Sequence, residues 1–306
     1  MGVGGMTNTE SAAQRAPGAQ KRAAPSVGLA LGGGAARCVA HIGVLQVFEE
    51  ERIPINLIAG TSGGSLVGAL YAAGLEPKWM AELAERMNWG HLVKLNLRRD
   101  GLLDTEGLER FVATLVKNQT FQDLRLPFAA VAVDLTSGEE IILREGPVAP
   151  AVRASSSIPG IFVPVRYKGR VLVDGGVRNN VPANLARRMG ANVVVAVDVG
   201  SRGPGRNGRV FEAPRNLIQV MMASYDILQQ AQVDRVLQEA DVVIRPDSGQ
   251  MSGFDLEHAG QYVEAGREAA QAAVPQIRAR LEEAERVLNR LDSIGPGRPL
   301  AGEEAD

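Results

Sequence analysis

Three short stretches of the chain contain residue types that could carry out nucleophilic catalysis. The first is Gly60-Thr61-Ser62-Gly63-Gly64, in which a glycine stands two residues before and two residues after a serine. It lies between an apolar run and an Ala- and Leu-rich run, the strand-to-helix setting of a nucleophile elbow. Gly60 and Gly64 permit a sharp turn, and the start of a helix favours negative charge developing at Ser62. The alternative is an ordinary turn in which Ser62 caps the helix.

The second stretch is rich in glycine and contains a basic residue. Gly32, Gly33 and Gly34 follow an apolar run and are followed in turn by Arg37. Uncovered backbone N–H groups in such a loop can bind an oxyanion, and Arg37 adds positive charge beside them. A dinucleotide-binding loop would need Gly or Ala in place of Arg37, and a P-loop would need a following Gly-Lys-Ser/Thr. A flexible turn without a ligand remains the alternative.

The third stretch is Asp174-Gly175-Gly176, at the end of a predicted strand. Parallel α/β proteins place their sites at the carboxyl ends of strands, although Asp-Gly is also a common turn pair. A carboxylate with a pKa of ~3.9 in water is a weak base. Asp174 could therefore accept the proton of Ser62 only if burial raised its pKa.

A histidine could serve as the base instead. His258 follows Ser62 and Asp174 in the chain order of α/β-hydrolase triads, but it lies close to a predicted helix start. His41 falls inside a helical pattern, which indicates a structural role, and His91 lies in a polar stretch. The residues alone leave a triad with His258 and a Ser-Asp dyad open, and they favour the dyad.

Apolar runs of strand length alternate with helical patterns along the chain, which indicates a parallel sheet covered on both faces. We predict one α/β domain over residues 26–292, a disordered tail at 1–25 and a flexible tail at 293–306. The predicted strands are 27–31, 55–60, 128–135, 139–145, 170–176, 192–200 and 241–247. The predicted helices, besides those after the glycine-rich loop and the elbow, are 76–89, 104–118, 182–189, 213–240 and 255–292.

Two of these segments have notable apolar residues. In the predicted helix 213–240 they fall on one face, which we interpret as facing the core; they are Leu217, Val220, Met221, Ile227 and Leu228. The stretch 76–103 combines apolar residues with Lys94, Arg98 and Arg99. It could hold an acyl chain or contact a lipid surface, or it could simply pack on the core. The apolar residues of this stretch are Trp79, Met80, Met87, Trp89, Leu92, Val93, Leu95 and Leu97.

The composition is that of an ordinary globular protein, with 306 residues, 45% of them hydrophobic, and a formal charge of −2. Without a basic field we expect no nucleic-acid partner. The single cysteine, Cys38, excludes an internal disulfide and fits a reducing, cytoplasmic compartment. We expect no signal peptide and no transmembrane helix. The spacing of His, Asp and Glu indicates no metal site, and we expect no cofactor.

The three stretches, taken together and in this order, resemble the patatin-like phospholipase family, in its bacterial type. Other parts of the sequence are also similar to that family: AHIGVL at 40–45, GLLDTEGLERFV at 101–112 and RASSSIPGIFVPV at 153–165. The resemblance covers about residues 26–275.

The resemblance implies a serine acyl hydrolase with a three-layer α/β/α fold and a mainly parallel central sheet. Its substrates would be acyl esters of phospholipids, lysophospholipids or neutral glycerolipids, with peripheral membrane contact as an option. Carried over position by position, Ser62 would be the nucleophile and Asp174 the base, with no histidine involved. The implied oxyanion hole consists of the backbone amides of Gly33, Gly34 and Ala35, assisted by Arg37.

The sequence departs from the family pattern at two positions. Ala35 stands where a fourth glycine is usual, and it can still donate its N–H if its φ is negative. Cys38 replaces a glycine and puts a side chain where the helix packs close to the sheet. Two other functions stay open: an acyltransferase that uses the same nucleophile, and a catalytically idle regulator with this fold.

Overall fold

The computed structural model of the protein describes residues 24–87, 92–96, 101–200, 214–247 and 257–294. Most of both predicted tails lies outside these ranges. So do several residues singled out above: Trp89, His91, Leu97, Arg98 and Arg99.

The described residues form a mostly parallel sheet of eight strands in the order β10-β9-β1-β2-β5-β8-β7, with β6 paired to β5. β10, β9, β1, β2 and β5 run parallel, whereas β6, β7 and β8 are antiparallel to their neighbours. The strands are β1 Val27–Leu31, β2 Leu57–Thr61, β5 Phe128–Asp134, β6 Glu140–Leu143, β7 Val165–Tyr167, β8 Arg170–Asp174, β9 Val193–Val197 and β10 Val242–Ile244. A separate short hairpin consists of β3 Lys94–Leu95 and β4 Leu103–Asp104.

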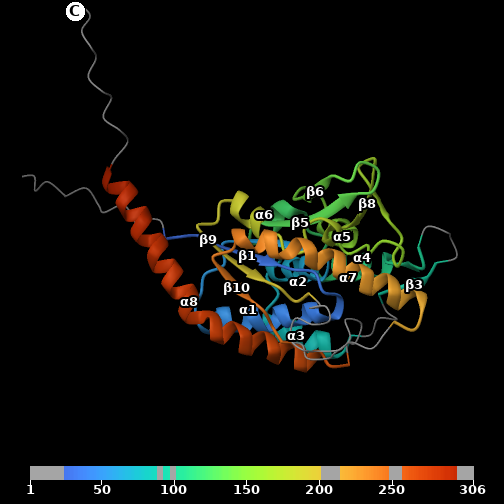
Figure 1. Cartoon of the computed structure of the whole chain (residues 1–306), viewed down its shortest axis with the longest axis horizontal. Helices are drawn as coiled ribbons and strands as arrows, with labels where there is room; N and C mark the ends of the chain where they lie inside the picture. The colour runs from blue at the N-terminus through green and yellow to red at the C-terminus, as the bar shows by residue number, and fades with distance from the viewer. Residues whose placement is uncertain (1–23, 88–91, 97–100, 201–213, 248–256, 295–306) are drawn as a thin grey trace, which may run out of the picture.

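Helices cover both faces of this sheet, as Figure 1 shows. The α-helices of the described residues are α1 Ala40–Glu50, α2 Gly63–Ala72, α3 Pro77–Glu85, α4 Glu106–Leu115, α5 Val148–Ser155, α6 Ala183–Arg188, α7 Leu217–Val236 and α8 Ala259–Ile294. Short 3-10 turns are η1 Ala35–Val39, η3 Phe121–Asp123, η4 Gly175–Val177 and η5 Leu237–Glu239.

The alternation of side chains along the buried strands explains the three layers. In β1, Leu29 and Leu31 enter the larger core beneath α1, α2, α3 and α8, while Ala30 points to the opposite face. That face carries smaller side chains and is covered by α6 and the end of α7, which contributes Val233. Because successive side chains of a strand point to opposite faces, every fully buried strand contributes side chains to a hydrophobic core on each face of the sheet. The predicted three-layer α/β/α fold with a mainly parallel sheet is confirmed.

Sequence patterns located most elements but missed α5, β7 and the short β3–β4 hairpin. Helix α5 begins after Pro147 and has Pro150 in its first turn, where a missing N–H breaks no helical hydrogen bond. Two prolines in so short a segment resemble a turn in the sequence. Strand β7 has only three residues and lies at the edge of the sheet, too short to show a period.

Helix α7 corrects the interpretation of its apolar face. Leu217, Val220, Ile227 and Leu228 are exposed, with 47–72% of their surface accessible, instead of facing the core. The helix instead turns Tyr225 and Gln229 inward, toward the site described below. Periodicity had identified the amphipathic helix correctly, but it does not show which face points inward.

None of the helices within the described ranges combines the length and apolarity needed to cross a membrane. In the same part of the chain, no three potential metal ligands among His, Cys, Asp and Glu lie together.

Candidate active site

Ser62 occupies a strained turn between β2 and α2. Its φ of 53° and ψ of −127° lie outside the common regions for a residue with a side chain. Such a conformation costs about 1–3 kcal/mol and persists only when the surroundings impose it. Here the Ser62 N–H donates to Ser155 Oγ at 3.0 Å, and the Ser62 carbonyl accepts from Ser65 Oγ at 2.7 Å. The sharp strand-to-helix turn with Ser62 at its tip is the kind of backbone that a nucleophile elbow requires.

Close backbone approach explains the glycines around Ser62. A side chain at Gly64 would collide with the carbonyls of Leu31 and Gly32, so α2 could not start so near β1. A side chain at Gly60 would likewise meet Ser65 Cα at 2.7 Å. Gly64 thus lets the elbow lie against the glycine-rich loop, and Gly60 lets the first turn of α2 lie close to β2.

The strand pairing brings Asp174 next to this elbow. Thr61, the last residue of β2, pairs with Val131 of β5, and Asp174, the last residue of β8, pairs with the next residue, Ala132. β2 runs parallel to β5 while β8 runs antiparallel, so the carboxyl ends of β2 and β8 meet. Residues more than a hundred positions apart in the sequence thus come together at one point of the sheet.

The Asp174 carboxyl is fully buried, and this burial raises its pKa to about 6. Oδ1 accepts a hydrogen bond from the Gly176 N–H at 2.7 Å. Oδ2 is buried without a hydrogen bond of normal geometry, but the hydroxyls of Ser62 and Tyr225 lie close enough to oppose part of the increase in pKa. Catalytic hydrogen bonds are often long in the absence of substrate. No histidine is among the described groups that shift the pKa of Asp174.

Sequence reasoning missed the contribution of α7 to this site. Burial, followed by the Asp174 charge, raises the pKa of Tyr225 well above its ordinary value, so the phenol stays protonated. A side chain at Gly176 would collide with Gln229 and lie 2.9 Å from the Tyr225 hydroxyl. The glycine of the Asp-Gly-Gly stretch thus makes room for α7. Tyr225 follows Asp174 by some fifty residues with no local motif, and no signal in the sequence links the two.

The glycine-rich loop lies beside Ser62, but its amides are not equivalent. The Gly33 N–H donates to the Asn180 carbonyl at 3.0 Å, so in this structure it is occupied. Among the described backbone hydrogen bonds, none uses the N–H of Gly34 or Ala35. Gly63, the residue after the serine, begins α2 and lies against Cys38 and the Ala35 carbonyl. The first N–H groups of a helix have no partner within it.

Ala35 differs from expectation in its backbone conformation. Its φ is +48°, in the left-handed region that favours glycine, and not the negative value on which donation of its N–H was conditioned above. The loop therefore keeps the shape that a glycine would adopt. For a residue with a Cβ this conformation costs roughly 1–2 kcal/mol.

Replacing Ala35 by glycine should relieve that strain. We expect Ala35→Gly to raise the free energy of unfolding by about 1 kcal/mol, measured by urea denaturation. The neighbouring Ala36→Gly is the matched control, because Ala36 is buried and is not among the residues with positive φ. It should lower stability by about 1 kcal/mol. Equal destabilisation by both changes would contradict the strain at Ala35.

Arg37 is buried and binds groups other than the serine. Its Nε donates to the Val199 carbonyl at 3.0 Å, and its guanidinium lies 3.8 Å from the Asp226 carboxylate of α7. The side chain therefore ties the glycine-rich loop to α7.

Two other buried titratable side chains, His41 and Cys38, follow the glycine-rich loop in the chain. The His41 ring is completely buried, and its Nε2 lies 2.7 Å from the Gly32 carbonyl, so Nε2 carries the proton. Burial lowers the pKa of His41 to about 4, which keeps the ring neutral. Burial raises the pKa of Cys38 to about 12 despite the nearby Arg37, so this thiol remains protonated.

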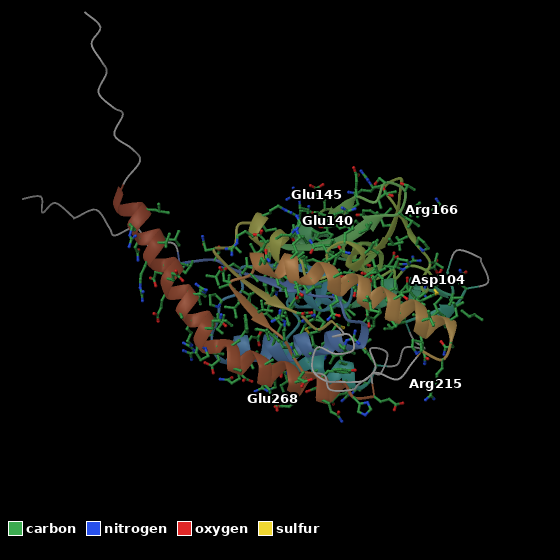
Figure 2. All side chains as sticks on the ribbon, in the orientation of Figure 1. Asp104, Glu140, Glu145, Arg166, Arg215 and Glu268 are labelled. Atoms are coloured by element: carbon green, nitrogen blue, oxygen red, sulfur yellow. The ribbon has the colours of Figure 1, made fainter. Side chains whose placement is uncertain are left out.

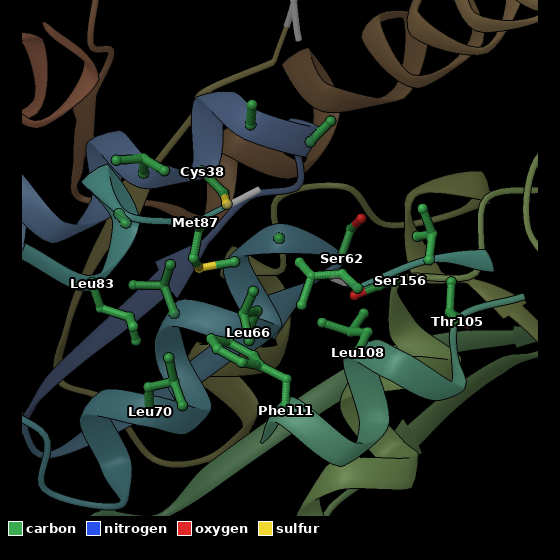
Figure 3. Close-up of a pocket in the computed structure, with 18 of the residues that line it drawn as sticks. Cys38, Ser62, Leu66, Leu70, Leu83, Met87, Thr105, Leu108, Phe111 and Ser156 are labelled. Carbon is green, nitrogen blue, oxygen red and sulfur yellow. The ribbon is translucent and has the colours of Figure 1, made fainter. Parts of the chain in front are cut away.

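A mainly apolar cavity of about 100 Å³ opens at Ser62 and extends between α2, α3 and α4. Its few polar groups are the hydroxyls of Ser62, Ser156 and Thr105, which Figure 3 shows on one side. The far side is formed by apolar residues such as Leu70 and Leu83. The cavity has the shape and chemistry to hold an apolar chain with its polar end at the serine.

The stretch 76–103 contributes to this cavity more than to the surface. Met80 and Leu92 are buried and, with Met87 and Val93, line the cavity. Trp79 and Leu95 are exposed. This placement fits two of the interpretations given above, packing on the core and holding an acyl chain.

The fold and this site define a class: a three-layer α/β/α protein with a serine elbow, a buried aspartate and an apolar cavity. The family model described as patatin-like phospholipase matches residues 29–187, more than half of the chain. The chain belongs to the patatin-like phospholipase family.

Relatives share this region at moderate identity. Patatin-like phospholipase domain-containing protein 6 of Homo sapiens is 36% identical over 185 residues, which cover 58% of this chain and 14% of the human protein. An uncharacterized NTE family protein of Mycobacterium tuberculosis is 31% identical over 277 residues, covering 84% of this chain and 48% of that protein. The chain thus spans less than half the length of these relatives.

A solved structure supports the fold. The crystal structure of VipD from Legionella pneumophila matches with a TM-score of 0.52 and 14% sequence identity, covering 85% of this chain and 67% of that chain. At this identity the similarity shows the fold alone.

Proposed function

We propose that the protein is a serine hydrolase that cleaves acyl esters of lipids, with Ser62 as nucleophile and Asp174 as general base. One observation carries the proposal. A fully buried carboxyl, with a pKa raised to about 6, lies beside a serine on a strained turn at the mouth of an apolar cavity. Carboxyl groups with a strongly shifted pKa beside a possible nucleophile are concentrated at catalytic sites. Membership of the patatin-like phospholipase family agrees with this assignment.

The reaction proceeds in two steps. Asp174 takes the proton from the Ser62 hydroxyl while Oγ attacks the ester carbonyl carbon, and the negative charge moves to the carbonyl oxygen. The intermediate collapses, the protonated Asp174 gives its proton to the leaving alkoxide, and an acyl-Ser62 ester remains. Asp174 then takes a proton from water as the water oxygen attacks this ester. The second intermediate collapses to the fatty acid, and Asp174 returns the proton to the departing Ser62 oxygen.

The oxyanion requires hydrogen-bond donors in place before the reaction. We assign this role to the N–H groups of Gly34 and Ala35, and to Gly63 on the other side of the elbow, since Gly33 is engaged with Asn180. Each such donor is worth about 3 kcal/mol, or 10²–10³ in rate. Arg37 acts as a positioning residue, because its guanidinium binds Val199 and Asp226.

Product analysis tests this function directly. Purified protein incubated with a phospholipid or lysophospholipid in detergent micelles should release free fatty acid, and Ser62→Ala should release none above background. A long-chain alcohol is added as acceptor in a second reaction. If the acyl group appears mainly in the acceptor ester, the protein is a transferase. If no acyl group leaves any substrate, an idle regulator becomes the better account.

The cavity should set the length of the acyl chain. Leu70 lies on α2 two helical turns beyond Ser62, about 12 Å along the helix. Leu70→Trp should block the far part of the cavity and lower the turnover of palmitoyl esters relative to butyryl esters about 10-fold or more. Leu66→Trp, one turn closer to the serine, should shift the preference to still shorter chains. An unchanged chain-length profile in both folded variants would show that the acyl group binds elsewhere.

A further inference from the structure

Helix α7 presents an apolar, uncharged face to the outside. Its exposed side chains Leu217, Val220, Ile227 and Leu228 form what we call the α7 outer face. Between Leu217 and Val233 the only charged side chain is Asp226, which lies 3.8 Å from the buried Arg37. Isolated exposed leucines are normal on proteins, but several on one helix without intervening charge mark a binding surface.

The inner face of the same helix is mixed: polar Tyr225, Gln229 and Gln232 lie there together with apolar Met222 and Val233. Gln232 Nε2 donates to the Val177 carbonyl at 3.0 Å, and Gln229 and Tyr225 approach Gly176 beside Asp174. A helix on the surface of a protein in water normally turns its apolar stripe inward. In Figure 2 helix α7 crosses the front of the molecule, and the labelled Arg215 and Asp104 lie near its N-terminal end.

Helix α7 lies close to the cavity at Ser62, with its outer face turned away from it. Met222 and Tyr225, on the inner side of α7, pack against Ile158 and Phe162, which line that cavity. Leu103 of the β3–β4 hairpin joins the same cluster, and the adjacent Leu102 is exposed. A single helix therefore separates the cavity from an apolar exterior.

We propose that the α7 outer face docks on a lipid surface and thereby places the cavity beside the lipid aggregate that supplies its acyl ester. This inference rests on the proposed function for its substrate. The uncharged character of the face matches hydrocarbon better than a protein partner, because protein–protein interfaces surround their apolar centre with a polar rim. Burying the apolar face of a helix at the boundary of headgroups and acyl chains is the established mode of interfacial binding.

Sedimentation with phosphatidylcholine vesicles tests the surface. Wild-type protein should sediment with the vesicles, and the double variant Ile227→Gln, Leu228→Gln should lose at least about 10-fold in partition coefficient. Glutamine keeps helix propensity and adds no charge. The control is Val287→Gln, Leu291→Gln on α8, where side chains of similar exposure are changed far from α7 along the chain. It should bind vesicles like wild type.

Several results would overturn the proposal. Absence of vesicle binding by wild type, wild-type binding by the α7 variant, or equal loss in the α8 control would each do so. Size-exclusion chromatography adds another: if wild type is a dimer, the α7 variant a monomer and vesicle binding unchanged, the face binds a second copy instead.

The same experiment separates this surface from the proposed function. Ser62→Ala should bind vesicles like wild type, since docking requires no chemistry. Vesicle binding that depends on α7, in a wild-type protein that hydrolyses no ester, would refute the proposed function and leave the surface intact. Ester hydrolysis with vesicle binding independent of α7 would refute the surface alone.

Discussion

The substitution Asp174→Asn should lower ester turnover by about 10²–10⁴-fold, because it removes the general base and leaves the shape of the site unchanged. The carbonyl oxygen of the new amide could still accept from the Gly176 N–H, as Oδ1 of the carboxylate does at 2.7 Å. Its NH₂ group could donate to the Ser62 or Tyr225 hydroxyl, both of which lie near Oδ2. The comparison is kcat/KM for a dissolved short-chain ester, with circular dichroism to confirm that the variant is folded.

The same base predicts the pH dependence of the wild type. Asp174 must be ionised to accept a proton, and burial raises its pKa to about 6. The value of kcat/KM should therefore be half-maximal near pH 6, level above about pH 7 and fall about tenfold per unit below. A profile that stays level from pH 5 to 8, or turnover by the asparagine variant within a few-fold of wild type, would contradict the dyad.

The asparagine variant should also be more stable than the wild type at neutral pH. The pKa of Asp174 rises from an ordinary value of 3.8 to about 6 in the folded protein, because the carboxylate is fully buried. A carboxyl whose pKa is raised on folding contributes stability below pH 3.8, and this contribution is lost as the pH rises through about 6. A shift of about 2 units corresponds to about 3 kcal/mol. At pH 8 the folded wild type therefore bears the full free-energy cost of burying an ionised carboxylate, and the uncharged asparagine variant does not.

Denaturant unfolding at pH 8 and pH 4 measures this difference. The gain in unfolding free energy of Asp174→Asn should approach about 3 kcal/mol at pH 8 and shrink toward zero at pH 4. Asp134→Asn is a control of opposite sign, because hydrogen bonds from Thr136, followed by Arg170, lower the pKa of Asp134. That variant should lose stability at pH 8, and the loss should shrink as the pH falls. If Asp174→Asn instead lowered stability at pH 8, the buried carboxylate would not destabilise the folded protein, which would contradict the raised pKa.

Local sequence was enough to predict the catalytic candidates, because each depends on its neighbours in the chain. The glycines around Ser62 and after Asp174 appear in the sequence as turns, and the strands before them appear as apolar runs. The structure agrees with those patterns at β1, β2 and β8. The residues alone favoured a dyad of Ser62 with Asp174 and left a triad with His258 open, and the resemblance to the family implied the dyad.

What the sequence could not predict depends on contacts between distant segments. The Gly33 N–H is occupied by Asn180, 147 positions away in the chain. Arg37 meets Val199, which follows β9, the strand paired with β1, and Asp226 of α7. The direction of the α7 apolar face is also a tertiary property, since periodicity is the same for a face turned inward or outward. The positive φ of Ala35 was missed because the residue carries a side chain that normally avoids it.

The most direct test of the account is covalent labelling with an alkyl fluorophosphonate, followed by peptide mass mapping. The reagent reports the nucleophilicity of a serine without requiring the natural substrate, because the serine oxygen attacks phosphorus and fluoride leaves. The account predicts one adduct, on Ser62, formed faster at pH 8 than at pH 5 and at least about 100-fold more slowly in Asp174→Asn. A folded protein that forms no adduct on Ser62, or forms it equally fast without the Asp174 carboxylate, would contradict the claim that Asp174 activates Ser62.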